Sequence, residues 1–127
     1  MRKTTTDSIL VASNIPEFKN QGALWFKENE SKIKSLSGKN SWWRNHVRLI
    51  SVSDAVSPLT LMRELDDFGY SKTSRVLNPG EFAFMGSMLS LWPINLENPM
   101  AIDFDGNFIE SIYPIKTIPR SDLGSRS

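Results

Sequence analysis

The second half of the chain is divided into short apolar runs by residues that favour turns. The cluster Asn78-Pro79-Gly80 is a turn signal, Gly86 interrupts an apolar run, and Pro93 ends one. Asp105-Gly106 separates two alternating runs and is a strong hairpin signal, because both turn residues must tolerate positive φ. The positions of these turn residues predict an antiparallel sheet that ends in a hairpin. The expected strands are Ser74–Leu77, Glu81–Met85, Ser87–Trp92, Met100–Phe104 and Asn107–Tyr113.

One helix is predicted between Ser57 and Gly69. Ser57 suits the N-cap, Pro58 the first helical position, and Gly69 a left-handed residue after the last turn. Its apolar face is formed by Leu61, Leu65 and Phe68, widened by Leu59 and Met62. A second helix is expected over 22–36, with Gly38 as its stop.

Two further strands are expected near the start of the chain, at Ser8–Ala12 and His46–Val52. The order is then strand, helix, strand, helix and several strands, which favours an α+β fold. We therefore expect a mainly antiparallel sheet with a C-terminal β-hairpin and two or three helices packed on it. The core face of the sheet or its edges are expected to contain Phe82, Leu89, Leu91, Ile102, Phe104, Ile109 and Ile112.

Composition indicates one globular domain. The chain has 127 residues, 23% charged and 39% hydrophobic, with a net charge of +1. We expect a disordered lead-in over 1–7, a single domain over 8–118 and a flexible tail over 119–127. The absence of cysteine excludes disulfides and thiolate chemistry, and the start lacks the apolar stretch of a secretory signal. The prediction is a cytoplasmic protein that does not contact membranes.

The residue patterns argue against an enzyme. Ser37-Gly38-Lys39-Asn40 has a Gly-Lys pair without the upstream glycine or the following hydroxyl residue of a phosphate-binding loop. His46 is the single histidine, and no serine lies in a nucleophile elbow. The carboxylates of Glu64, Asp66 and Asp67 fit a solvated helix end. We therefore predict no catalytic residues, no metal, no cofactor and no small-molecule substrate.

A basic and aromatic segment precedes the second strand. Trp42 and Trp43 lie in a stretch that has no acidic residue and carries Lys32, Lys34, Lys39, Arg44 and Arg48. Such a mixture can neutralise phosphates and stack on unpaired bases, or serve a protein contact. It is equally compatible with one tryptophan in the core and solvated lysines. A nucleic-acid contact through Lys39, Trp42, Trp43, Arg44 and Arg48 is therefore one hypothesis.

Several motifs in the second half occur in an order typical of one family. The chain resembles the UvrB-interaction domain of the transcription-repair coupling factor and the equivalent domain of UvrB. The motifs are Leu65-Asp66-Asp67-Phe68-Gly69-Tyr70, Pro79-Gly80-Glu81-Phe82-Ala83, Gly86 with Met88-Leu89-Ser90-Leu91-Trp92-Pro93, Ile102-Asp103-Phe104-Asp105-Gly106 and Ile109-Glu110-Ser111-Ile112. The resemblance extends over 47–112 and, more faintly, to 8–11. Residues 19–44 are unmatched.

The resemblance implies a non-catalytic domain of nucleotide excision repair that binds UvrA, with Lys72, Arg75, Phe84 and Met85 as contact residues. This chain departs from the family at the position before Gly86, where Met85 replaces an arginine implicated in holding UvrA. Ser71 likewise replaces an arginine, and Ser90 an acidic residue. A thioether in place of a guanidinium removes charge-assisted hydrogen bonds and leaves an apolar contact.

Two alternatives to UvrA binding are a nucleic-acid-binding module and the same fold with a different protein partner. UvrB and the coupling factor also carry helicase motor modules, which this chain lacks. The chain is thus expected to be either a fragment of a longer protein or a stand-alone interaction domain.

Overall fold

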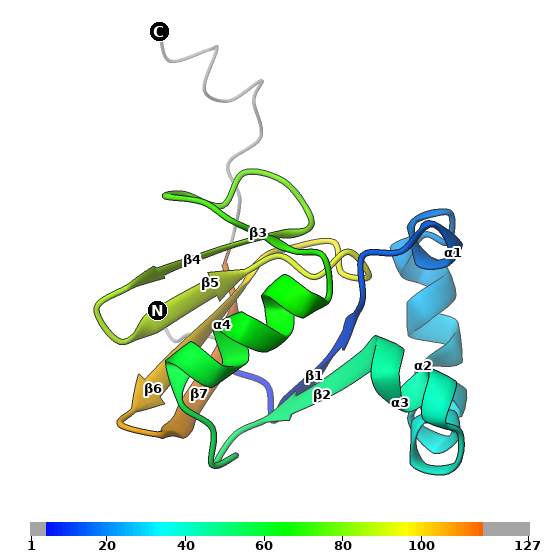
Figure 1. Cartoon of the computed structure of the whole chain (residues 1–127), viewed down its shortest axis with the longest axis horizontal. Helices are drawn as coiled ribbons and strands as arrows, with labels where there is room; N and C mark the ends of the chain where they lie inside the picture. Colours follow the sequence, from blue (N-terminus) through cyan, green and yellow to red (C-terminus); the bar gives the residue numbers. More distant parts are fainter. Residues whose placement is uncertain (1–4, 116–127) are drawn as a thin grey trace, which may run out of the picture.

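The computed structural model describes residues 5–115 and contains two β-sheets and four helices (Figure 1). The elements are β1 (Ser8–Ala12), α1 (Pro16–Lys19), α2 (Ala23–Lys39), α3 (Ser41–His46), β2 (Val47–Ser51), α4 (Pro58–Asp67), β3 (Ser71–Lys72), β4 (Glu81–Met85), β5 (Met88–Leu91), β6 (Met100–Asp105) and β7 (Phe108–Pro114). The α+β prediction is confirmed. No helix within 5–115 is both long and apolar enough to cross a bilayer.

The larger sheet has the strand order β3-β4-β5-β6-β7. Its pairs are antiparallel except for β3 and β4, which are parallel. Gly86, with φ of 65°, makes the tight turn between β4 and β5 together with Ser87. In the C-terminal hairpin Asp105 pairs with Phe108, so the turn residues are Gly106 and Asn107. The predicted hairpin is confirmed, and its turn lies one residue later than the Asp105-Gly106 pair suggested.

The main core lies between one face of this sheet and α4. The strand register aligns Phe82 with Leu91 and Leu89 with Ile102, and α4 adds Leu61 and Leu65. All seven sheet residues predicted for the core face or its edges are buried. Helix α4 itself forms as predicted, because the Ser57 hydroxyl accepts a hydrogen bond from the Thr60 amide and Gly69 adopts a φ of 86° after the last turn.

The two-stranded sheet formed by β1 and β2, hereafter the ribbon, divides the interior in two. Alternate side chains of a strand point to opposite faces. Ile9, Val11 and Ile50 therefore join the main core, whereas Leu10 and Val47 join a second core. The second core also contains Ala12 and residues of the helices, namely Phe18, Phe26 and Ile33. In Figure 1, α1, α2 and α3 gather beside one end of the ribbon, away from the larger sheet.

Side chains from distant segments close the β1 edge of the ribbon. The Asn95 amide donates to the Leu10 carbonyl at 2.7 Å and accepts from the Ala12 amide at 3.0 Å. The Tyr70 hydroxyl donates to the Ala12 carbonyl at 2.7 Å. A strand edge carries hydrogen-bonding groups that must find partners when buried. Asn95 and Tyr70 thus replace a neighbouring strand.

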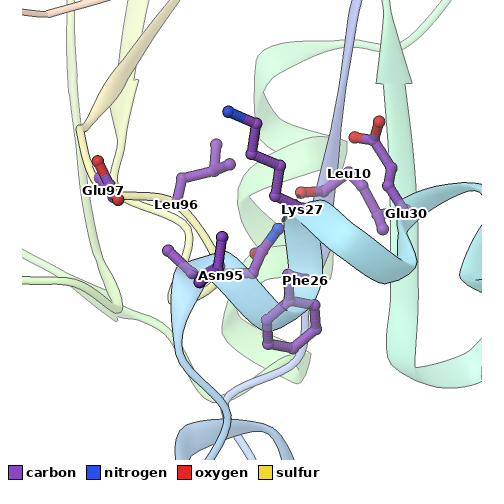
Figure 2. A pocket seen from close by; sticks show the side chains of 9 residues that line it. Leu10, Phe26, Lys27, Glu30, Asn95, Leu96 and Glu97 are labelled. Atoms are coloured by element: carbon purple, nitrogen blue, oxygen red, sulfur yellow. Dashed lines mark hydrogen bonds between the residues drawn. The ribbon is translucent and has the colours of Figure 1, made fainter.

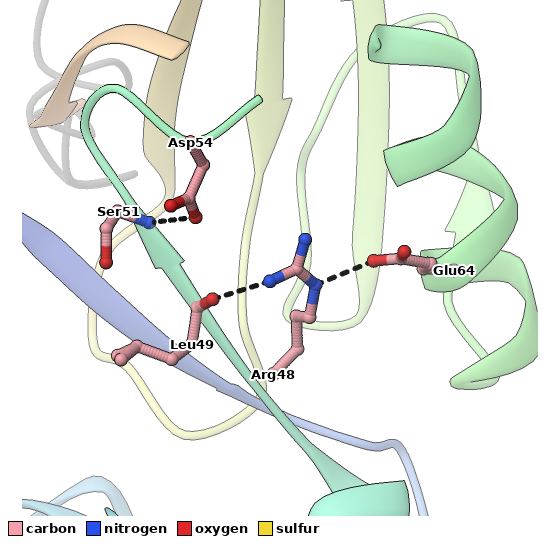
Figure 3. A network of polar contacts seen from close by, with 5 residues as sticks. All are labelled: Arg48, Leu49, Ser51, Asp54 and Glu64. Atoms are coloured by element: carbon pink, nitrogen blue, oxygen red, sulfur yellow. Dashed lines mark hydrogen bonds and ion pairs between the residues drawn. The ribbon is translucent and has the colours of Figure 1, made fainter. Parts of the chain in front are cut away.

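The β2 edge is closed in a similar way (Figure 3). The Arg48 guanidinium donates to the Leu49 carbonyl at 2.7 Å, and the Asp54 carboxylate accepts from the Ser51 amide at 2.9 Å. Arg48 also forms an ion pair with Glu64 of α4, at 2.7 Å. Edges blunted by charged side chains resist pairing with other chains.

Several local predictions need correction. The strand expected at Ser74–Leu77 is wrong: β3 is formed by the earlier residues Ser71 and Lys72, because they are the ones that reach β4. Gly38 does not stop α2, which continues to Lys39. The short helices α1 and α3 were not predicted.

The domain limits stay a prediction. Residues 1–4 and 116–127 lie outside the described residues, and so does the expected tail over 119–127. At the end of the expected lead-in, the Thr6 amide donates to the Ile112 carbonyl at 2.9 Å, and the Asp7 carbonyl accepts from the Val52 amide.

Candidate partner-binding surface

Two of the predicted contact residues are Lys72, the last residue of β3, and Arg75, in the loop between β3 and β4, and both are exposed. The Thr73 amide donates to the Phe82 carbonyl at 2.8 Å, and the Glu81 carboxylate accepts from the amides of Leu77 and Asn78 at 2.8 and 2.9 Å. These two bonds hold the pKa of Glu81 below its usual range. The loop is therefore fastened to β4 at two points, one before and one after Arg75.

Met85 lies at the tip of the β4–β5 hairpin. Its side chain is 77% exposed, the highest value among the large hydrophobic residues of the described segment. Phe84 precedes it in the strand and therefore points to the opposite face, where it is half-buried against the main core. Met88, which pairs with Met85, is half-buried. Phe84 and Met85 thus do not form one patch, and Met85 is the accessible member.

A groove of about 390 Å³ lies between α4 and the β3–β4 edge. It was not predicted as a site, although Leu59 and Met62 had been placed on the margin of the helix face. Leu59 is 56% exposed there. The groove is lined by Leu59, Met62, Arg63, Asp66, Asp67, Lys72 and Phe82. Its lining therefore combines apolar side chains with charged groups of both signs, and it includes Lys72, which directly precedes the loop that carries Arg75.

The second predicted surface is only partly assembled. Trp43 packs against the second core, and Arg48 is engaged by Glu64. Trp42 is 42% exposed, whereas Lys39 and Arg44 are exposed. The five residues therefore separate into two that are partly buried, Trp43 and Arg48, and three that are exposed.

A second pocket, of about 290 Å³, lies where α2 meets β1 and the loop after β5 (Figure 2). Its lining residues are Leu10, Ala23, Leu24, Phe26, Lys27, Glu30, Asn95, Leu96 and Glu97. The Asn95 amide is already used by the ribbon. The charged groups that remain are one lysine and two carboxylates, which favour neither an anion nor a cation.

Three of the four predicted contact residues are therefore exposed, on β3, on the loop after it and at the hairpin tip, whereas Phe84 faces the main core. The chain belongs to the UvrB interaction domain family, whose model matches residues 49–126. The match begins within β2, so β1 and the three helices α1 to α3 precede it.

Proteins similar to this chain include three transcription-repair-coupling factors. The Bacillus subtilis protein is 31% identical over 70 residues, which are 55% of this chain and 6% of that protein. The Escherichia coli protein is 30% identical over 73 residues, 58% of this chain and 6% of that protein. The Borreliella burgdorferi protein is 26% identical over 95 residues, 75% of this chain and 8% of that protein. The chain thus corresponds to less than a tenth of the length of these relatives.

Proposed function

We propose that this domain binds UvrA or a UvrA-like protein in bacterial nucleotide excision repair, in the cytoplasm and without catalysing a reaction. The observation that carries the proposal is the family match over the five-stranded sheet, which includes β3, β4 and the hairpin. The similarity to three transcription-repair-coupling factors supports a role in repair.

The proposed contact surface has a charged part and an apolar part. Lys72 on β3 and Arg75 on the fastened loop supply positive charge beside β4. Met85 supplies an exposed apolar tip on the adjacent hairpin. Phe84 contributes through the core, by holding β4 in place. A small apolar anchor beside charged rim residues is typical of transient protein interfaces.

Met85 is the residue that tests the proposal, because the family usually has arginine at this position. We expect Met85→Asp to abolish binding to UvrA from the same organism in a calorimetric titration of the purified chain. Met85→Arg should tighten binding about tenfold, because a charge-assisted hydrogen bond contributes about 1.5–3 kcal/mol. Both variants should fold, since the side chain is exposed.

Trp42→Ala is the matched control, because Trp42 lies on the three-helix segment that precedes the family match. It should leave the affinity for UvrA unchanged. Equal affinities for the wild-type chain and both Met85 variants would contradict the proposed surface. A lack of binding at both low and high salt would contradict UvrA as the partner and favour a different protein on the same fold.

A further inference from the structure

Charge is unevenly distributed between the two parts of the molecule. Residues 16–46, which form α1 to α3, contain six lysines and arginines and three glutamates, a net charge of +3. Residues 47–115 contain four lysines and arginines and nine carboxylates, a net charge of −5. The overall charge of +1 conceals this separation. A polyanion is therefore attracted to the three-helix segment and repelled by the five-stranded sheet domain.

Trp42 lies on this positive segment with its indole accessible. Its ring stacks at a tilt on the His46 imidazole, with centroids 4.5 Å apart, and meets the Trp43 ring edge-on at 5.1 Å. Of the exposed large hydrophobic side chains among the described residues, Trp42 is the one on α3; Leu24 lies at the opposite end of α2 and Leu49 on β2. The ring is thus held by its aromatic neighbours and remains partly exposed.

Two cations lie next to Trp42 in the chain. Asn40 caps α3 by accepting from the Trp42 amide at 2.8 Å, which sets α3 directly after the end of α2. The Arg44 Nε donates to the Ser37 carbonyl at 3.3 Å. Arg44 therefore lies on the last turn of α2, the turn that ends at Lys39. The Arg44 guanidinium has five N–H donors, and this bond uses one of them, so the other four can donate to a ligand.

We propose that the end of α2 together with α3 binds an unpaired nucleic-acid strand. Trp42 stacks on a base, and Lys39 and Arg44 contact phosphates on either side of it. Trp43 and Arg48 take no part, because the second core and Glu64 engage them. A protein ligand is disfavoured, because interface cores need contiguous apolar area, and here a single indole is exposed.

The test is a fluorescence-anisotropy titration of the full chain against fluorescein-labelled oligothymidylate and oligouridylate of about 20 nucleotides, which spans several stacked bases. With two phosphate contacts to a single strand, log Kd should change with log salt by a slope of about 1.4. Lys39→Ala should lower this slope by about 0.7, the contribution of one contact. Lys72→Ala removes the same charge from the β3 edge and should leave the slope unchanged.

Trp42→Ala should weaken binding about fivefold or more, as expected for loss of one stacked base, and Trp42→Phe should restore most of it. Circular-dichroism melting of each variant establishes whether the helices remain folded. Lys39→Ala tests the same surface with the aromatic residues left unchanged. Binding to either oligonucleotide with these effects supports the proposal. It is overturned by a lack of binding at low salt, by equal effects of Lys39→Ala and Lys72→Ala, or by a duplex that binds as tightly as the single strand.

Discussion

The Tyr70 hydroxyl lies 2.7 Å from the carbonyl oxygen of Ala12 and donates a hydrogen bond to it, while accepting one from the Ile94 amide at 3.0 Å. Tyr70 follows α4, Ala12 ends β1, and Ile94 belongs to the loop after β5. One phenol therefore joins three segments. Burial raises the pKa of Tyr70 above its usual range, so the hydroxyl remains a donor at all physiological pH values.

Replacing Tyr70 with phenylalanine should lower the free energy of unfolding by about 1–3 kcal/mol, because the buried Ala12 carbonyl and the Ile94 amide lose their partner. Urea denaturation of the purified chain measures the difference. Ser74→Ala, which removes an exposed loop hydroxyl, should change stability by less than about 0.5 kcal/mol. A Tyr70→Phe variant as stable as the wild type would mean that this junction does not support the fold.

Asn95→Ala should be more destabilising, by about 2–4 kcal/mol, because it leaves both the Leu10 carbonyl and the Ala12 amide without a partner in the interior. The Ala12 amide should also exchange with deuterium faster, since its protection depends on Asn95. Asn98→Ala, at an exposed position of the same loop, is the control and should leave both quantities unchanged. Unaltered exchange at Ala12 in the Asn95 variant would refute the role given to this side chain.

Two glycine-to-alanine substitutions should have opposite effects on stability. Gly80 has a φ of 88°, and an added Cβ would lie 3.3 Å from the side-chain nitrogen of Asn14. Gly80→Ala should therefore lower the free energy of unfolding by more than about 1 kcal/mol. Gly38 lies inside α2 with nothing within 4 Å of an added Cβ. Gly38→Ala should therefore stabilise by up to about 1 kcal/mol. Thermal melting of both variants measures the two changes in stability. Changes of the same sign in the two variants would contradict the prediction.

Glu81 should make the free energy of unfolding depend on pH. Its pKa is lowered in the folded chain, so the folded state favours the ionised carboxylate more than the unfolded chain does. The resulting stabilisation is present above the ordinary glutamate pKa of about 4.3 and is lost as the pH falls below it. Glu81→Gln should remove this dependence. Denaturation curves of both chains at neutral pH and near pH 3 should converge at the lower pH, and a constant difference would argue against the proposed loop anchor.

Local chemistry accounts for the parts of the fold that could be predicted. The Ser57 hydroxyl caps the start of α4, and the left-handed Gly69 follows its last turn, so residues at the helix ends set its limits. Gly106, with its positive φ, likewise sets the final turn by its own residue type. The bond between Asn95 and Ala12 joins residues 83 positions apart, and nothing near either residue indicates it. Likewise, β3 is formed at Ser71 and Lys72 because they reach β4, which is a property of the assembled sheet.

The exposure of the surface residues could not be predicted from the sequence either. Trp42 and Trp43 are adjacent and identical in type, yet one is exposed and the other packs against the second core. The distinction arises because adjacent residues of a helix point about 100° apart around its axis, so only Trp43 of the two faces the second core. Similarly, Arg48 is removed from the basic surface by its ion pair with Glu64 and its hydrogen bond to the Leu49 carbonyl. Composition located this surface, and the tertiary structure decided which side chains remain on it.

Ala12 and Val47 lie directly opposite each other in the ribbon, so the chain leaves and re-enters the fold at a single point. The cost of closing a loop grows only with the logarithm of its length. The entropic cost of closing this connection therefore depends little on the number of residues in it. A segment of another length would still have to bury Leu10, Ala12 and Val47, as Phe18, Phe26 and Ile33 do here, and could then change what this end of the molecule recognises.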